Sequence, residues 1–207
     1  GLDTLVHVAN GIYENCPNDE AHELFKLPDF VNKMVENKWF GSKTGQGFYK
    51  KVGNDILTLD LNTLEYRTAK KASFATLELT KTIDKPINRF KVLVKGNDKA
   101  GEFYRKSFAG LFAYVSNRIP EISDELYKID DAMKAGFGWE NGPFEIWDAI
   151  GVEKAIEIMK AEGLQPATWV NEMIASGNNS FYTVKEGATY FYDIPTKTQA
   201  KVPGQDA

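Results

Sequence analysis

Apolar side chains recur at helical spacing after Gly1 and again after Gly151, and the two runs open with similar tripeptides, GLD and GVE. Spacings of three and four residues place such side chains on one face, so both segments are predicted to be amphipathic helices. The apolar positions are Leu2, Leu5, Val6, Ala9, Ile12 and Tyr13 in the first segment and Val152, Ala155, Ile156 and Met159 in the second.

The likeness between the two segments continues along the chain. Each first helix is followed by a proline and a second short apolar pattern, and then by aromatic and turn residues at one constant offset. Three matches in the same order predict an internal duplication. The matching residues are Val31, Asn32, Met34 and Val35 with Val170, Asn171, Met173 and Ile174, and Phe48, Tyr49, Asp60 and Thr63 with Phe181, Tyr182, Asp193 and Thr196.

Short runs with strand character close both copies. Apolar residues at 56–61 face Leu64 and Tyr66 across a turn near Asn62, and residues 186–188 turn a corresponding hairpin. A long helix with an apolar stripe precedes Gly151, whereas no counterpart precedes Gly1. The first copy is therefore expected to be incomplete, and the chain to be part of a longer polypeptide. The stripe consists of Tyr104, Phe108, Leu111, Phe112, Val115 and Ile119.

These patterns predict a mainly α fold, a duplicated helical domain in which each copy ends in a small β-hairpin. Residues 1–67 are predicted to be the C-terminal half of the first helical domain with its ribbon, and 68–100 a connector with a short helix around 87–94. Residues 101–202 are predicted to be the second helical domain with its ribbon, and 203–207 a linker.

The loop GSKTGQGFYKK, residues 41–51, has the composition of a phosphate-binding loop but not its order. A P-loop lysine follows the last glycine and opens a helix, whereas Lys43 and Thr44 precede Gly45 and Gly47 and a strand follows. No GxGxxG stands between a strand and a helix in these 207 residues. A structural glycine corner and a contact to a substrate phosphate both stay open for this loop.

A second informative stretch is ENGPFEIWDAIG, residues 140–151. Pro143 suits a first helical turn, Glu145 favours the positive helix N-terminus, and Gly142 permits close backbone approach. Two interpretations follow. Gly142, Pro143 and Phe144 form either a tight helix–helix corner with aromatic core residues or a wall of a substrate pocket.

No catalytic or metal-binding set emerges from the spacing of polar residues. No carboxylate pair is forced together as a general acid and base, and Asp130 and Asp131 are predicted to be a solvated helix start. His7, His22 and Cys16 are too few for a Cys/His metal site. The aromatic run 190–192 lacks a flanking arginine cluster, so packing is favoured over base stacking.

Composition narrows the class of protein. A hydrophobic content of 43% suits a folded chain with a core, and a formal net charge of −4 argues against a general nucleic-acid surface. No apolar run approaches the ~20 residues of a membrane span, and no secretory leader is visible. A single cysteine, Cys16, excludes a disulfide framework and favours a reducing, cytoplasmic setting.

Two long motifs resemble one known family. KWFGSKTGQGFYK (38–50), preceded by PDFVNKMVENK, is similar to the end of the C-terminal domain of 3-hydroxyacyl-CoA dehydrogenases, and IDDAMKAGFGWENGPFEIWDAIGV (129–152) resembles the middle of that domain. The tandem arrangement is similar to that of bacterial β-oxidation proteins in which an enoyl-CoA hydratase domain follows the dehydrogenase.

The resemblance implies that different domains of the parent enzyme have different functions. In this family an NAD-binding Rossmann domain supplies the glycine-rich loop and the catalytic His–Glu pair, and both would lie before Gly1. The helical domain closes the acyl-CoA cleft and makes the dimer contact, and in tandem proteins the second copy substitutes for a partner subunit. The chain itself is then expected to hold no catalytic residue, cofactor site or metal, and to be inactive alone.

The sequence departs from the family pattern at one place. Its long helix opens with an Asn–Arg pair that reaches the substrate, whereas the matching place here holds Arg105 and Lys106 after Tyr104, and Asn117–Arg118 lies too close to Ile129. The second copy is therefore expected to be degenerate as a substrate site. Lys43, Thr44 and Gly45 belong to the copy that would face the real active site.

Two functions remain open at this stage. The first is the substrate-closing and assembly region of an NAD-dependent dehydrogenase of fatty acid β-oxidation, and the second is a non-enzymatic helical interaction module derived from this domain. Because a helix before Gly1 would normally cover the first stripe, self-association through residues near Leu2, Leu5, Val6 and Ile12 is also expected.

Overall fold

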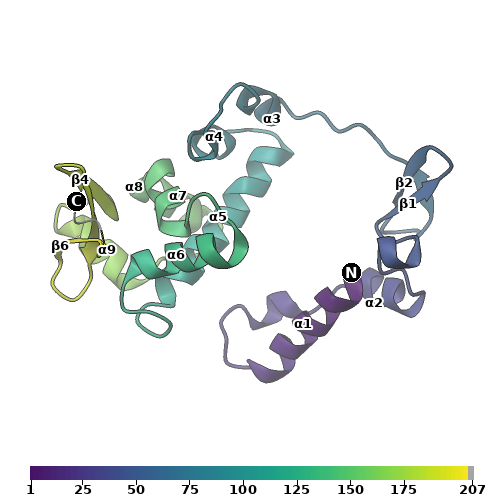
Figure 1. Ribbon diagram of the computed structural model, residues 1–207, viewed down its shortest axis with the longest axis horizontal. Coiled ribbons are helices and arrows are strands. Elements are labelled where there is room, and N and C mark those ends of the chain that lie inside the picture. Colours follow the sequence, from purple (N-terminus) through teal and green to yellow (C-terminus); the bar gives the residue numbers. More distant parts are fainter. Residues whose placement is uncertain (205–207) are drawn as a thin grey trace. The chain divides into compact units, whose positions relative to one another are not determined.

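The chain folds into two separate units in a computed structural model, which describes residues 1–204. Gly1–Ala72 form unit 1, and unit 2 begins at Ser73 (Figure 1). The division falls inside the segment 68–100 that was predicted to be a connector. Of the predicted linker 203–207, the last three residues lie outside the described part of the chain.

Unit 1 begins with two α-helices and ends in a small sheet. Asp3 lies in the first turn of one helix and Asp29 in that of the other, where a negative charge suits the helix N-terminus. The elements are α1 (Leu2–Asn15), η1 (His22–Phe25), α2 (Asp29–Glu36), η2 (Ser42–Thr44), β1 (Tyr49–Val52), β2 (Asp55–Leu59) and β3 (Tyr66–Thr68).

The core of unit 1 is small. It centres on four buried side chains, one from α1, two from α2 and one from β2, with a ring of half-buried neighbours. Large apolar side chains such as Leu5 stay exposed. The buried residues are Leu2, Val31, Met34 and Leu59.

Each predicted hairpin forms two strands of a three-stranded antiparallel sheet, so the expectation of two simple hairpins was wrong. The strand order is β1-β2-β3 in unit 1 and β4-β5-β6 in unit 2. Leu59 pairs with Tyr66 as expected. The additional strand of unit 2, β6, follows Asp193 and carries mostly polar residues, which left no apolar alternation to reveal it.

Unit 2 has most of the helices that the structure describes. The predicted short helix near 87–94 is present, and the predicted long helix begins at Lys99, whereas α3 was not predicted. The elements are α3 (Ala75–Thr80), α4 (Pro86–Leu93), α5 (Lys99–Asn117), α6 (Leu126–Phe137), α7 (Pro143–Ile150), α8 (Val152–Ala161), α9 (Thr168–Ala175), β4 (Tyr182–Lys185), β5 (Ala188–Asp193) and β6 (Thr198–Lys201).

An aromatic stack runs through the core of unit 2. Phe112 of α5 stacks on Trp147 of α7 with ring centroids 4.9 Å apart, and Phe144 and Phe181 lie edge-on to each other at 5.0 Å. All four are essentially inaccessible to solvent. Because buried aromatic side chains contribute large apolar areas, this stack is a main source of the stability of unit 2.

Candidate functional site

The loop between α2 and β1 holds three residues that were predicted to lie beside a substrate: Lys43 and Thr44 belong to η2, and Gly45 is its C-cap. Lys43 forms an ion pair with Asp3 in the first turn of α1. The Thr44 hydroxyl accepts a hydrogen bond from the Phe40 N–H at 3.0 Å. Gly45 has a φ of 77°, which a glycine adopts without steric cost.

The side chains of Lys43 and Thr44 are engaged with α1 and with the loop itself, respectively. The hydrogen bond from Lys43 lowers the pKa of the Asp3 carboxyl, so this carboxylate is charged at neutral pH. η2 has only three residues and is not followed by an α-helix, so Lys43 does not stand at a phosphate-binding helix N-terminus. These contacts favour a structural corner, and a contact to a substrate phosphate stays a prediction.

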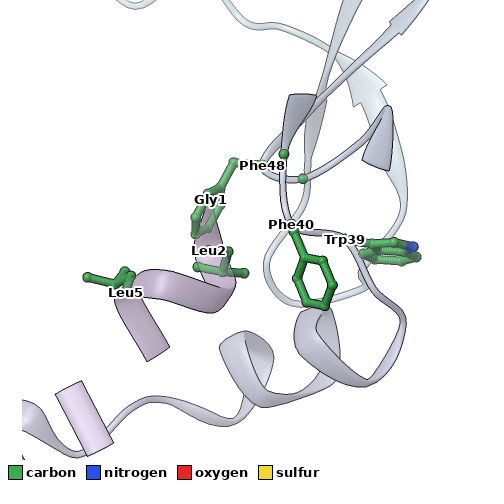
Figure 2. A pocket seen from close by; sticks show the side chains of 8 residues that line it. Gly1, Leu2, Leu5, Trp39, Phe40 and Phe48 are labelled. Carbon is green, nitrogen blue, oxygen red and sulfur yellow. The ribbon is translucent and has the colours of Figure 1, made fainter. Parts of the chain in front are cut away.

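An open apolar pocket of about 270 Å³ lies beside this loop, and we call it the Phe48 pocket. Figure 2 shows Leu2 and Leu5 extending from α1, with Trp39 and Phe40 coming from the segment after α2. The Leu2 N–H donates a hydrogen bond to the Phe40 carbonyl at 3.0 Å, which joins the start of α1 to the segment after α2 beside the pocket. The lining residues are Gly1, Leu2, Leu5, Trp39, Phe40, Gly41, Gly47 and Phe48.

The corner before α7 is built around a buried carboxylate. Asp130 of α6 accepts hydrogen bonds from the Phe144 N–H at 2.9 Å and the Glu145 N–H at 3.0 Å. The Tyr182 hydroxyl donates to the same carboxylate at 2.9 Å. Asp130 therefore caps a helix other than its own, because the first N–H groups of a helix have no partner within it.

The prediction that Asp130 is a solvated helix start was wrong. Asp130 lies in the middle of α6 and is completely buried, whereas Asp131 is exposed as expected. The sequence did contain a signal, since Asp130 lies four residues after the buried Leu126 and three before the half-buried Met133. A charged residue on the apolar face of a helix needs a buried partner, and here the start of α7 supplies it.

Gly142, Pro143 and Phe144 form the helix–helix corner. A Cβ atom at position 142 would lie 2.3 Å from both Cβ and Cγ of Asp130, so only glycine fits. The Glu145 carboxylate accepts a hydrogen bond from the Gly142 N–H at 2.9 Å and from Lys134 at 2.5 Å. Phe144 is completely buried. The interpretation as a core corner is supported, and its role as a pocket wall stays a prediction.

A second carboxylate, Asp148 at the other end of α7, holds the start of β4. Its two oxygens accept hydrogen bonds from the Phe181 and Tyr182 N–H groups, both at 2.8 Å. Burial raises the pKa of Asp148 to about 7, and it raises that of Asp130 to about 7, while the donated hydrogen bonds act in the opposite direction. Burial also raises the pKa of Tyr182, which remains a neutral hydroxyl donor.

The residues at the place of the family's Asn–Arg pair have structural contacts. Arg105 donates to the Val94 carbonyl at 3.1 Å and also to that of Gly96, while Lys106 pairs with Glu102 at 2.7 Å. Asn117 donates to the carbonyl one turn earlier, at Ala113. These contacts agree with the expectation of a degenerate substrate site, which itself stays a prediction.

Three further features of the described residues concern metal ligands, helix length and a second cavity. Within residues 1–204, no three potential metal ligands among His, Cys, Asp and Glu lie together. No helix in the same range is long and apolar enough to cross a membrane. An apolar cavity of about 580 Å³ lies between α5 and α6, with Arg118 and Lys128 among its lining residues.

Comparison with known proteins shows which family these elements belong to. Residues 118–190, which include α6 to α9 and β4, match the family described as 3-hydroxyacyl-CoA dehydrogenase, C-terminal domain. Residues 118–190 of this chain belong to the 3-hydroxyacyl-CoA dehydrogenase C-terminal domain family. The buried corner of Asp130, Gly142 and Phe144 and the Asp148 contact to β4 lie within the matched segment of this dehydrogenase domain.

Individual relatives extend the similarity beyond the matched segment. A Bacillus subtilis protein named "Probable 3-hydroxyacyl-CoA dehydrogenase" is 41% identical over 193 residues, which is 93% of this chain and 24% of that protein. A Rickettsia felis protein named "Putative fatty acid oxidation complex trifunctional enzyme" is 26% identical over 151 residues, which is 70% of this chain and 19% of that protein. This chain thus spans about a quarter or less of these relatives. No solved structure gives a significant match.

Proposed function

We propose that this chain is the substrate-closing and assembly region of an NAD-dependent 3-hydroxyacyl-CoA dehydrogenase of fatty acid β-oxidation. The observation that carries the proposal is the 41% identity to the Bacillus subtilis protein over 93% of the chain, which includes both units. The match of residues 118–190 to the C-terminal domain adds to it. A non-enzymatic helical interaction module is the second candidate, since the described side chains form no catalytic set.

In this proposal the chemistry belongs to other parts of the enzyme. A Rossmann domain would bind NAD and supply the His that takes the hydroxyl proton of the 3-hydroxyacyl-CoA while hydride passes to nicotinamide. The residues of this chain would close the acyl-CoA cleft and hold the assembly together. The neighbourhood of Lys43, Thr44 and Gly45 is the part of unit 1 that we place beside the substrate. A cytoplasmic location fits this pathway.

We further propose that the two units descend from one duplicated domain. The helices α1 and α2 followed by a three-stranded sheet correspond in order to α8, α9 and the sheet of unit 2. The paired strand residues of the two units are separated by the same distance in sequence. Tyr49 lies opposite Thr58 in unit 1, and Tyr182 lies opposite Phe191 in unit 2. The buried pairs also correspond, because Val31 and Met34 are buried in unit 1 as Val170 and Met173 are in unit 2.

Unusual turns support the same proposal. Leu64 and Lys197 are separated by the same distance in sequence as the corresponding strand residues of the two units. Both adopt a left-handed backbone conformation, with φ of 59° and 56°. Residues with side chains rarely adopt this conformation, so its recurrence at matching places is informative. Asp60 and Asp193 precede these turns and accept hydrogen bonds from backbone N–H groups within them.

The isolated chain is expected neither to bind NAD nor to oxidise 3-hydroxyacyl-CoA, because the proton acceptor and the cofactor loop would lie in another domain. Titration calorimetry with NAD, together with an assay of NADH absorbance, measures both properties. A saturable site with a micromolar dissociation constant, or measurable turnover, would show that the chain contains the dehydrogenase centre itself.

The coding sequence around this chain separates the two candidate functions. The dehydrogenase proposal predicts a strand–GxGxxG–helix unit encoded ahead of Gly1. A hydratase-like domain encoded beyond Ala207 would identify the tandem β-oxidation type. The interaction-module candidate predicts neither, so a reading frame without the dinucleotide-binding unit would favour it.

A further inference from the structure

Unit 1 has an aromatic side chain that lacks the cover its counterpart has in unit 2. Phe48 immediately precedes β1 and remains 39% exposed at the rim of the Phe48 pocket. Its ring lies edge-on to Phe30 of α2 with centroids 6.4 Å apart. Its carbonyl accepts a hydrogen bond from the Leu59 N–H at 2.9 Å. The residue is thus well anchored on one side and open on the other.

Phe181 has the same anchors in unit 2 but is completely buried. It lies edge-on to Trp169 of α9 at 5.8 Å, and its carbonyl accepts from the Tyr192 N–H at 2.8 Å. The additional cover in unit 2 comes from α7. Its Phe144 and Trp147 rings have their centroids 5.0 Å and 4.9 Å from that of Phe181. The Phe48 pocket therefore lies where α7 lies in unit 2.

The polar contacts show the same difference. In unit 2 the Asp148 carboxylate accepts hydrogen bonds from the Phe181 and Tyr182 N–H groups, and Asp130 accepts one from the Tyr182 hydroxyl. In unit 1, no acceptor for the Phe48 N–H is recorded within residues 1–204. Tyr49, the counterpart of Tyr182, is 64% exposed. The backbone N–H groups and the tyrosine hydroxyl that carboxylates bind in unit 2 thus lack a carboxylate partner, among the described residues, at the corresponding places of unit 1.

The path of the chain indicates where a covering segment would attach. α7 ends at Ile150, and Gly151 joins it directly to α8. Gly1 stands before α1 as Gly151 stands before α8, and it lines the Phe48 pocket. A helix that covered this pocket as α7 covers Phe181 would end at the residue that precedes Gly1.

We propose that the Phe48 pocket is the docking site of a helical hairpin of the α6–α7 pattern, carried by the same polypeptide ahead of Gly1. Its second helix would bring two aromatic side chains three residues apart into the pocket. An aspartate directly after them would accept from the N–H groups of Phe48 and Tyr49. A second aspartate, on the first helix, would accept from the Tyr49 hydroxyl. The proposal does not depend on dehydrogenase activity.

A graft tests this proposal in the full chain. A second copy of residues 126–150 is placed directly ahead of Gly1, and amide hydrogen exchange is followed by NMR. We expect exchange of the Phe48 and Tyr49 amides to slow at least tenfold relative to the ungrafted chain. The matched control carries Phe144→Ala, Trp147→Ala and Asp148→Ala in the grafted copy alone, and its Phe48 and Tyr49 amides should exchange as in the ungrafted chain.

Three results would overturn the proposal. The first is unchanged exchange at Phe48 in the graft, and the second is equal protection in graft and control. The third is protection in the ungrafted chain that grows with protein concentration, with a dimer in light scattering lost in a Leu5→Asp, Ile12→Asp variant. That third result would mean that a second copy of this chain occupies the pocket. If the graft misfolds, a synthetic peptide of residues 126–150 added to the ungrafted chain must give the same protection.

Discussion

Replacing Gly142 by alanine is expected to lower the free energy of unfolding of unit 2 by about 3 kcal/mol, the upper end of the usual cost of overpacking a core. The added Cβ would lie 2.3 Å from the Cβ of Asp130 and 2.5 Å from its Cα. Asp130 cannot move aside easily, because its carboxylate holds the start of α7 and the Tyr182 hydroxyl. The backbone at Gly142 has a φ of −78°, which alanine adopts without strain. The loss of stability therefore comes from steric crowding alone.

Gly136→Ala is the matched control for this substitution. Gly136 lies within α6, and a Cβ there would meet no atom within 4 Å. Alanine should therefore stabilise unit 2 by about 0.5–1 kcal/mol, since glycine is the poorer helix former. Urea unfolding in a Trp39→Phe background reports unit 2 alone, because the other tryptophans all follow Ser73. Equal midpoints for the two variants would contradict the crowding argument.

Asp130→Ala is expected to cost unit 2 about 3 kcal/mol or more. The substitution removes the acceptor of two backbone N–H groups and one hydroxyl, and each buried donor left without a partner costs about 1–3 kcal/mol. Relief from burying a carboxylate, whose pKa burial raises to about 7, offsets part of that cost. The same urea measurement gives the value.

The neighbouring Asp131→Ala provides the control. Asp131 is exposed and its nearest cation, Lys134, is 3.7 Å away, so its loss should change stability by about 0.5 kcal/mol or less. Asp130→Asn should fall between the two alanine variants, because an amide oxygen can accept a hydrogen bond but its NH₂ group cannot. An Asp130→Ala effect no larger than that of Asp131→Ala would mean that α7 does not depend on this cap.

The sequence predicted most of the helices, because apolar spacing of three and four residues follows directly from helix geometry. One of its two interpretations of residues 140–151 placed aromatic side chains in the core, and Phe144 and Trp147 are completely buried. The short strand β6 was not predicted, since Thr198–Lys201 carries mostly polar residues and shows no apolar alternation. Strands of that kind are fixed by hydrogen bonds to a neighbour, which local sequence does not encode.

The candidate site shows a different limit. The role of Asp130 depends on Gly142 and Phe144, which are 12 and 14 positions away, and on Tyr182, which is 52 positions away. No local pattern connects these residues, so a buried cap looked like an ordinary acidic helix start. The Phe48 pocket was equally invisible, because it is recognised only when the surroundings of Phe48 and Phe181 are compared in space.

The proposed role in a dehydrogenase is tested most directly by exchanging this region into a relative. The stretch of the Bacillus subtilis protein that aligns with this chain is replaced by the chain, and kcat/KM for NAD-dependent oxidation of a 3-hydroxyacyl-CoA is compared with that of the intact protein and of a deletion of the same stretch. We expect the exchanged protein to retain activity within about tenfold of the intact one, a loss of about 1.4 kcal/mol at most in transition-state stabilisation, and the deletion to lose far more. An exchanged protein as inactive as the deletion, although folded, would contradict the account.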